Sequence, residues 1–430
     1  MKFLADRRCF LKSLGTGAVS AIGFPLLGCD DPERYTEADA AQLREQMAHE
    51  KRISGQSRFG KHVYQGYRGL ADLPYFEIDQ NDRLRCVVEG LPPVTDVHTH
   101  LGIAVLFSPS IDLLARTPRV RHLLDCDGTR PGCTLDLDVY INANFSEDDL
   151  ASMEWETLGQ GLWGSASART HTVPNLLAEM DDTGIQQSVV LPIALGLPFR
   201  DELADLWTQA IEQSGSRDRL LPGASVHPED ENAVAELRRQ AALGVRIVKL
   251  HPAVQRFYPD DPRADPIYET CRQLGLPVFF HGGRAGIEPE YTHRFTLIKN
   301  YEGAVDRHPE VDFVMGHAGA RDVKDAIPLA QRHPNVFLDI HGQGIRQIDE
   351  LIDQVGADRL LFGSDWPFYH PAATLAKVLI VTEGRPEIRD AILVNTARRL
   401  LAKSEPPERF SLPDPRAKTP ASGSHPPQPT

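Results

Sequence analysis

Residues 94–100 have the sequence VTDVHTH, a stretch rich in apolar and β-branched residues that has histidines at positions 98 and 100. Such a run favours a buried β-strand, and since successive side chains of a strand point to opposite faces, His98 and His100 share a face. Seven further runs of this kind follow along the chain. They are QSVVLPIA (187–194), LLPGASVHP (220–228), VRIVKLHP (245–252), LPVFFHGG (276–283), VDFVMGHAG (311–319), NVFLDIHG (335–342) and RLLFGSDWP (359–367).

Segments with helical periodicity lie between these runs, such as ENAVAELRRQAALG at 231–244. Nearly continuous apolar strands that alternate with helices are typical of a parallel sheet covered on both faces. Eight strand and helix units are the number that closes a barrel. The sequence therefore predicts an α/β fold, a (β/α)8 TIM barrel, over residues 93–403.

The chain carries additions that a minimal barrel does not need. About residues 101–172 form a long insert after the first strand, and such a loop usually serves as a lid or a substrate wall. Residues 29–92 precede the barrel, and their patterns predict a surface helix at 36–52 and a β-hairpin at 75–88. Residues 404–430 are rich in proline and small polar residues, which predicts a disordered tail.

Residues 1–28 have the composition of an export signal. Arg7 and Arg8 precede Phe-Leu-Lys and an apolar stretch that is too short to span a bilayer. This order resembles a twin-arginine signal, and Leu-Leu-Gly-Cys at 26–29 resembles a lipoprotein cleavage box. We expect an exported protein that faces the periplasm or the cell exterior and contacts the membrane only through a lipid on Cys29. The alternative is an ordinary basic N-terminus that is never cleaved.

Charge and cysteine content narrow the possible partners. The 430 residues carry a formal charge of −14, which argues against a nucleic acid and leaves a small-molecule substrate as the expected partner. The sequence gives no indication of the oligomeric state. Cys126 and Cys133 lie in one polar loop, CDGTRPGC, and are close enough to form a disulfide in an oxidising compartment.

Residues that bind metals fall at the ends of the predicted strands. His98 and His100 end the first strand, His281 and His317 end two later ones, and Asp365 ends the last. Barrel active sites are built at the carboxyl ends of the strands, so these side chains converge on one rim. Several imidazoles with one carboxylate make a site for a divalent ion such as zinc. The histidines taken as ordinary core or surface residues are His49, His62, His293, His308, His333 and His425.

The motifs DVHTH, VKLHP, HGG, GHAG and GSDWP, in this order, resemble the amidohydrolase superfamily. The resemblance is greatest to its amidohydrolase-related branch of metal-dependent TIM barrels, which holds the aminocarboxymuconate-semialdehyde decarboxylase-like enzymes. It covers about residues 93–403 and implies His98, His100, His281 and Asp365 as metal ligands. It also implies His317 as the catalytic histidine. Asp365 suits the second role of taking a proton from an activated water.

Other polar residues near the strand ends have open roles. In some branches of the superfamily a lysine on the fourth strand is carbamylated and bridges two metals, and Lys249 has that position. We favour one metal, because a lysine is also common there in the mononuclear branch. Arg284 follows the His281 glycines, where it would either pair with a substrate carboxylate or face solvent. The histidines expected to line the pocket rather than bind metal are His227, His251 and His341.

Three hypotheses for function remain. The first is a metal-dependent hydrolase of an ester, lactone or amide, favoured by the export signal and by a long insert that would build a roomy pocket. The second is a non-oxidative decarboxylase that uses the same residues on a conjugated or aromatic acid. The third, a lipoprotein that only binds a ligand, is the weakest because no expected metal ligand is missing.

Overall fold

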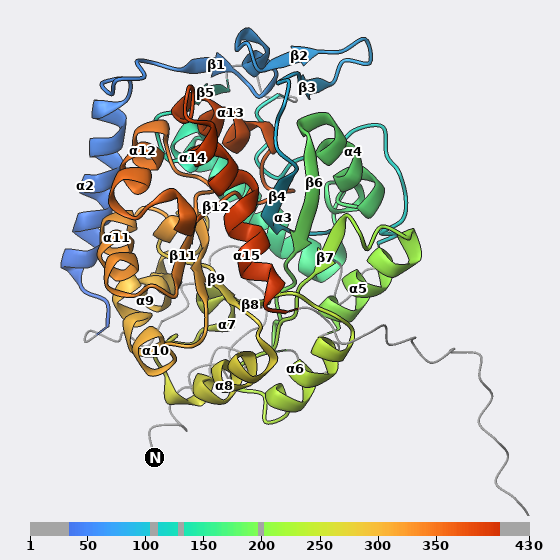
Figure 1. Cartoon of the computed structure of the whole chain (residues 1–430), viewed down its shortest axis with the longest axis vertical. Coiled ribbons are helices and arrows are strands. Elements are labelled where there is room, and N and C mark those ends of the chain that lie inside the picture. Colours follow the sequence, from blue (N-terminus) through green and yellow to red (C-terminus); the bar gives the residue numbers. More distant parts are fainter. Residues whose placement is uncertain (1–33, 104–110, 128–132, 197–201, 405–430) are drawn as a thin grey trace, which may run out of the picture.

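The computed structural model describes residues 34–103, 111–127, 133–196 and 202–404 (Figure 1). Within this part of the chain, eight short strands run parallel to one another. They pair in the orders β4–β6–β7 and β8–β9–β10–β11–β12. Their bounds are β4 (Val94–Thr99), β6 (Ile185–Val190), β7 (Leu220–Pro222), β8 (Val248–Leu250), β9 (Val278–Phe280), β10 (Phe313–Met315), β11 (Val336–Asp339) and β12 (Leu360–Leu361).

Two further contacts join these two sheets into a ring. Ala224 forms a parallel bridge with Val248, which connects the end of β7 to β8. Thr99 forms another with Trp366, which connects β4 to the segment after β12. Each strand then has a neighbour on both sides, so the sheet is a closed barrel. The chain has the TIM-barrel fold that the sequence predicted.

Alternation along the strands separates the barrel interior from its outer layer. Lys249, Phe279, Val314 and Phe337 are register partners across four adjacent strands, so their side chains share a face. Phe279, Val314 and Phe337 belong to a small apolar cluster that also includes Leu400 from the last helix. The neighbouring strand residues belong to the larger core beneath the helices. Burial on both faces explains why the strands read as continuous apolar runs.

Most helices surround the ring on its outer side, whereas the last helix, which carries Leu400, crosses the strands at one end of the barrel (Figure 1). Their first turns follow the strands' carboxyl ends, which leaves that rim free for polar side chains. The main helices are α4 (Val173–Thr183), α5 (Leu203–Ser214), α6 (Ala233–Ala242), α8 (Asp265–Leu274), α10 (Glu302–Arg307), α11 (Val323–Arg332), α12 (Ile345–Gln354), α13 (Ala372–Val381), α14 (Pro386–Asp390) and α15 (Thr396–Ala402), with single turns α7 (Pro252–Gln255) and α9 (His293–Thr296).

The segment before the barrel contains the predicted helix and hairpin. Helix α2 (Glu37–Ile53) begins at a capping box in which Thr36 and Asp39 each accept the other's backbone N–H, and it lies beside α11 and α12 (Figure 1). Strands β2 (Phe76–Ile78) and β3 (Leu84–Cys86) pair antiparallel, which confirms the hairpin.

The long insert folds together with this N-terminal segment. Strand β5 (Thr134–Asp136) of the insert pairs antiparallel with β1 (Val63–Gln65), so the two regions that the sequence analysis treated separately share one small sheet. The insert also contributes helix α3 (Glu147–Trp163). A disulfide joins Cys126 to Cys133 at the base of the insert. The pairing predicted from the sequence is therefore the one that the structure has.

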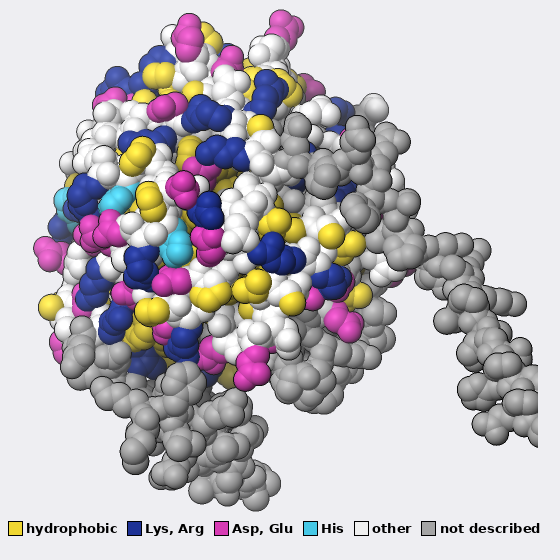
Figure 2. All heavy atoms as spheres, turned by 60° about the horizontal axis from the view of Figure 1, so that its bottom comes forward, with side chains coloured by type: hydrophobic (Ala, Val, Ile, Leu, Met, Phe, Trp, Pro, Cys, Tyr) yellow, Lys and Arg dark blue, Asp and Glu magenta, His cyan; other side chains and the backbone are white. Residues whose placement is uncertain are grey.

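The predicted export signal and the predicted tail lie outside the described residues. Export, lipidation of Cys29 and disorder after residue 404 therefore stay predictions. Within the described ranges, none of the helices combines the length and the apolar character that crossing a membrane requires. On the face drawn in Figure 2, basic and acidic side chains are interspersed, and the described residues of that face form no broad basic area.

Candidate active site

Polar side chains gather where strands of the barrel end. His98 is the penultimate residue of β4 and His100 follows that strand, while His281 follows β9. His317 comes after β10 and Asp365 after β12. The backbone N–H of Asp365 donates to the carbonyl of His98 at 2.8 Å, which fixes the end of the last strand against the end of the first. The closure of the barrel therefore also assembles the site.

The donor atoms of these side chains lie close together. Nε2 of His98 is 3.4 Å and Nε2 of His100 is 3.2 Å from Oδ1 of Asp365. Ligands that each lie about 2 Å from a tetrahedral ion are separated by about 3.3 Å. Three of the four predicted ligands therefore have the spacing of one metal centre. The fourth, His281, contacts the cluster through His317, with Nδ1 of His281 3.2 Å from Nε2 of His317.

The cluster contains buried nitrogen atoms that lack hydrogen-bond partners. Among the described residues, Nε2 of His281, Nδ1 of His317 and Nε2 of His341 are buried and unpartnered. Burial lowers the pKa of each of these three histidines well below its usual value, and nearby imidazoles and lysines lower it further. The rings are therefore neutral near pH 7 and hold lone pairs available to a cation. These residues fit a divalent metal ion.

Asp339, at the end of β11, holds the histidines in place. Its Oδ2 lies 2.8 Å from Nδ1 of His98 and also accepts the backbone N–H of His317 at 3.1 Å. Its Oδ1 accepts the backbone N–H of His341 at 3.0 Å. With Nδ1 of His98 directed at Asp339, Nε2 faces Asp365, as in carboxylate–histidine–metal arrangements. The sequence analysis missed Asp339, although its spacing from His341 repeats that of Asp96 from His98.

The segment after β10 is held in an unusual conformation. His317, Ala318 and Ala320 have φ angles of 58°, 50° and 48°, in the left-handed region that residues other than glycine rarely adopt. Each such residue costs about 1–3 kcal/mol unless its surroundings enforce the conformation. Here the side-chain amide of Gln343 donates to the carbonyls of His317 and Ala320, at 2.6 Å and 2.9 Å.

Lys249 and His251 share the interior face of the fourth barrel strand and its end. Lys249 is buried, and its Nζ lies 4.5 Å from the centre of the Phe279 ring. Desolvation lowers the pKa of Lys249 to about 8, although the Asp365 and Asp339 carboxylates oppose that shift. His251 stacks on His281 with a centroid distance of 4.2 Å. Both side chains line the cavity described below.

Three residues predicted to contact the substrate do not line the cavity, namely Arg284, His227 and His341. Arg284 is buried, and Asp322 accepts hydrogen bonds from both its Nε and its backbone N–H. The prediction for Arg284 is wrong because its guanidinium is already paired. His227 accepts a backbone N–H from Glu229 and is absent from the cavity lining. His341 is buried behind the metal-type cluster, with Nε2 3.7 Å from Oδ2 of Asp365.

A cavity of about 570 Å3 opens onto the cluster. Its floor is polar and includes His98, His100 and Asp365. Its walls are mainly apolar. They include the residues Leu101, Ile103, Leu123, Met153, Trp155, Ile193, Leu195, Trp207, Ile287, Pro289 and Phe368. Helix α3 supplies Met153 and Trp155, so the long insert does form a wall of the cavity, as expected for a substrate-binding loop.

Two charged residues of the cavity were not found from the sequence. Arg256 is exposed at the wall, and its closest polar partner is the hydroxyl of Tyr291 at 3.3 Å. Glu288 is buried, with an oxygen 3.9 Å from Nε2 of His281. Desolvation raises the pKa of Glu288 to about 7, although its backbone hydrogen bonds act in the opposite direction. Neither residue belongs to a strand-end motif, so no local pattern identifies it.

Comparisons with known proteins concern the family and the fold of the chain. The family model described as amidohydrolase matches residues 95–403. A gamma-resorcylate decarboxylase of Rhizobium radiobacter is 24% identical over 275 residues, which cover 49% of this chain and 84% of the relative. The enzyme of the same name from a Rhizobium species is 23% identical over 246 residues, covering 44% and 75%. The crystal structure of 5-carboxyvanillate decarboxylase from Sphingomonas paucimobilis superposes with a TM-score of 0.50 at 17% identity, covering 71% of this chain and 99% of that one.

Proposed function

Because the chain belongs to the amidohydrolase family, we propose that it is a metal-dependent, non-oxidative decarboxylase of an aromatic or conjugated carboxylic acid. The observation that carries the proposal is a largely apolar cavity that ends on a cluster of histidines and a carboxylate. A flat conjugated ring fits such walls, and its carboxylate would then face the polar floor. The likeness to two gamma-resorcylate decarboxylases supports decarboxylation over the hydrolysis that the sequence context favoured.

His98, His100, His281 and Asp365 would hold one divalent ion, for which we propose zinc. When bound, such an ion acts as a Lewis acid on a substrate oxygen. Neutral imidazoles suit ligation because the metal takes up an unprotonated nitrogen. One ion remains the proposal, because the donor atoms of His98, His100 and Asp365 all lie within 4.8 Å of one another, which is the spacing of a single centre.

The reaction replaces a carboxylate by hydrogen. The bond between the ring carbon and the carboxylate carbon breaks, carbon dioxide leaves, and the ring carbon takes up one proton. We assign delivery of that proton to Asp365, because it lines the cavity and its Oδ1 lies 3.4 Å and 3.2 Å from Nε2 of His98 and His100. Nδ1 of His317 is buried beside the same floor and is positioned to polarise the substrate.

The apolar walls contribute by excluding water. Trp207 and Phe368 lie near His100, at ring-centroid distances of 6.4 Å and 6.2 Å. A carboxylate in such surroundings loses its hydration, whereas the charge that develops during loss of carbon dioxide spreads over the conjugated ring. Arg256 at the cavity wall would select substrates that carry a polar substituent away from the reacting carboxylate.

The test uses metal-loaded protein and a panel of hydroxylated aromatic acids, esters and lactones. Turnover in deuterium oxide should release carbon dioxide and place deuterium on the carbon that carried the carboxylate. Turnover in oxygen-18 water should leave the product unlabelled. Label in a product acid, with no carbon dioxide released, would contradict decarboxylation and restore hydrolysis as the function.

The cellular location rests on the N-terminal sequence alone. We propose export through the Arg7-Arg8 signal and anchoring by a lipid on Cys29. Replacing both arginines by lysine should block export, since the receptor reads the arginine pair, and Cys29→Ser should release the protein from membranes. Cell fractionation with an antibody to the barrel measures both outcomes. Wild-type protein with an intact N-terminus in the cytoplasm would exclude the proposal.

A further inference from the structure

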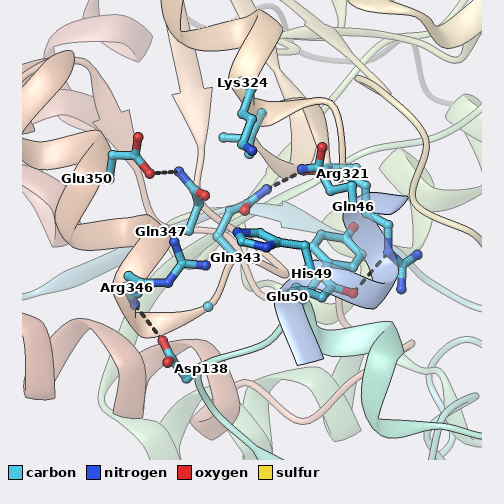
Figure 3. A pocket seen from close by; sticks show the side chains of 14 residues that line it. Gln46, His49, Glu50, Asp138, Arg321, Lys324, Gln343, Arg346, Gln347 and Glu350 are labelled. Atoms are coloured by element: carbon cyan, nitrogen blue, oxygen red, sulfur yellow. Dashed lines mark hydrogen bonds and ion pairs between the residues drawn. The ribbon is translucent and has the colours of Figure 1, made fainter. Parts of the chain in front are cut away.

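A second cavity, of about 180 Å3, lies between α2 and the first turns of α11 and α12 (Figure 3). It shares no lining residue with the apolar cavity. In contrast to the apolar cavity, most of its lining side chains are polar or charged. The residues that line it are Gln46, His49, Glu50, Asp138, Tyr140, Ala320, Arg321, Val323, Lys324, Gln343, Gly344, Arg346, Gln347 and Glu350.

Basic side chains reach this cavity from three helices. Lys324 comes from α11, Arg346 from α12 and His49 from α2. Figure 3 shows the three side chains directed toward the hollow from separate sides. Among the described residues, neither Lys324 nor Arg346 forms an ion pair, and Nε of Arg346 is buried without a hydrogen-bond partner. Two cations therefore line the cavity without an ion-pair partner, Lys324 at an exposed position and Arg346 at a half-buried one.

The acidic residues of the lining are already engaged elsewhere. The two oxygens of Asp138 accept the backbone N–H groups of Gly55 and Arg346, at 2.8 Å and 2.9 Å. The oxygens of Glu350 accept side-chain N–H groups of Gln347 and Gln354.

The remaining acid, Glu50, is directed at a different cation. Its Oε1 lies 3.4 Å from Nε of Arg321, a guanidinium that also donates to the carbonyl of Ala285 and lies over the ring of Tyr140. Of the described carboxylates that line the cavity, only Glu50 forms an ion pair, and its partner is Arg321 rather than Lys324 or Arg346.

The helix geometry adds to the positive potential. Lys324 and Arg346 are each the second residue of a ten-residue helix, so both helices begin at the cavity wall. The first turn of a helix carries a partial positive charge. The backbone N–H of Arg346 already donates to Asp138, so the helices contribute this partial charge rather than free N–H groups. Donors that approach from three directions match the oxygens of a tetrahedral anion better than those of a planar carboxylate, which one arginine fork would satisfy.

We propose that this cavity binds a phosphate group, held between Lys324 and Arg346 with His49 as a third donor. The group is either inorganic phosphate or the phosphate of a small metabolite, since both present the same oxygens. The proposal is independent of the reaction in the apolar cavity, because the two cavities have separate linings.

The test titrates inorganic phosphate into the metal-loaded full chain at constant ionic strength and follows binding by calorimetry. Lys324→Gln combined with Arg346→Gln should weaken binding at least tenfold. Arg398→Gln, which removes an exposed arginine of α15 outside the cavity, is the matched control and should bind as the wild type does. Since phosphate also coordinates metal ions, the variant His98→Ala with His100→Ala should keep the binding event.

No saturable binding to the wild type, or equal binding to the doubly substituted cavity variant, would overturn the proposal. If that variant does not fold, Lys324→Gln alone, at an exposed position, should give a smaller loss of affinity, and an unchanged affinity would count against the site. A phosphate monoester that binds more tightly than inorganic phosphate identifies a phosphorylated metabolite as the ligand. Weaker binding of the monoester identifies free phosphate.

Discussion

One short segment, 316–322, contributes to two cavities of opposite character. His317 lies in the floor of the apolar cavity, whereas Ala320 and Arg321 line the charged one. His317 and Arg321 are equally buried, at 2% exposure. The imidazole is neutral and lacks a partner at Nδ1, while the guanidinium has Glu50, a carbonyl and an aromatic ring around it.

The difference follows from what burial costs each group. A neutral imidazole can be buried with one nitrogen unsatisfied, because a metal ion or a bound substrate can supply the missing partner. A guanidinium cannot shed its charge, so it is buried only with acceptors around it. Unsatisfied atoms therefore mark the site in the first cavity. In the second, Arg321 is paired with Glu50, whereas Lys324 and Arg346 have no ion-pair partner and remain for a ligand.

Removing two metal ligands should affect the apolar cavity and leave the charged cavity unchanged. His98→Ala with His100→Ala should reduce the metal content to background and abolish activity, since the two remaining ligands hold no stable site. Elemental analysis and turnover measure both effects. His49→Ala, which removes a histidine from the charged cavity, is the control and should keep the metal and the activity. Full metal occupancy in the double variant would show that the ion lies elsewhere.

Asp365 separates metal binding from proton transfer within the same cavity. Asp365→Asn should lower kcat by about 10^3-fold, because an amide can still face the histidines but cannot carry the proton. Metal content and kcat measured on the same preparation distinguish the two roles. Complete loss of the metal would assign Asp365 a structural role in ligation, and near-normal kcat would remove it from the chemistry.

His122 is a buried histidine whose pKa is raised, whereas the pKa of His317 is lowered. Its Nε2 lies 2.9 Å from Glu179, which also accepts from the indole of Trp366 at 2.9 Å. Burial alone would lower the pKa of His122, but the Glu179 carboxylate raises it above its usual value. Burial alone would raise the pKa of Glu179, but His122 and His370 lower it to about 2.

The directions of these two pKa shifts set the pH range over which the His122–Glu179 pair stabilises the fold. The stabilisation from Glu179 is complete above its unfolded pKa of about 4.3 and is lost as the pH falls toward 2. The stabilisation from His122 is complete below about pH 6.5 and is lost as the pH rises through its raised folded pKa. Glu179→Gln should therefore cost about 3 kcal/mol of unfolding free energy at pH 5.5 and less at pH 9. Denaturant unfolding at both pH values measures the difference, and an equal cost would show that His122 is neutral.

The sequence located the barrel and the cluster because both depend on short-range patterns. Each strand reads as an apolar run, and His98, His100 and Asp365 sit at run ends whatever the helices between them do. The function of Asp339 could not be predicted from the sequence, because it depends on the pairing of β11 with β10, the strand that precedes His317. Arg284 was misassigned because Asp322, its partner, lies 38 residues further on.

The charged cavity lay beyond prediction for the same reason. His49 and Glu50 belong to α2, which precedes the barrel, yet Glu50 pairs with Arg321 across 271 residues of sequence. A histidine on a charged surface helix has no local feature that separates it from an ordinary exposed residue. The sequence analysis accordingly left His49 without a function. The pairing of β1 with β5 depends in the same way on contact between two regions far apart in the chain.

The smallest expected effect tests Gln343, which lies between the two cavities. Its side-chain amide lines the charged cavity and donates to the backbone carbonyls of His317 and Ala320. Its backbone carbonyl accepts a hydrogen bond from the buried Nζ of Lys377 at 2.8 Å. Gln343→Ala removes both of these hydrogen bonds, and each loss costs about 1 kcal/mol. The carbonyl of Ala320 is then left without a donor, whereas the carbonyl of His317 still accepts the backbone N–H of Ala320. The released segment can then leave its left-handed conformation, which moves the His317 ring.

We therefore expect Gln343→Ala to lower the unfolding free energy by about 2 kcal/mol. It should also lower kcat roughly 10-fold with little change in metal content, because the four proposed ligands stay in place. Gln347→Ala is the matched control, since Gln347 lines the same cavity and its amide donates only to Glu350, so its effect should stay within about 0.5 kcal/mol. Chemical denaturation and steady-state turnover of both variants give the comparison. If Gln343→Ala loses stability but keeps kcat, the conformation of the 316–322 segment serves only to fold the barrel; if both variants behave alike, Gln343 does not hold the segment at all.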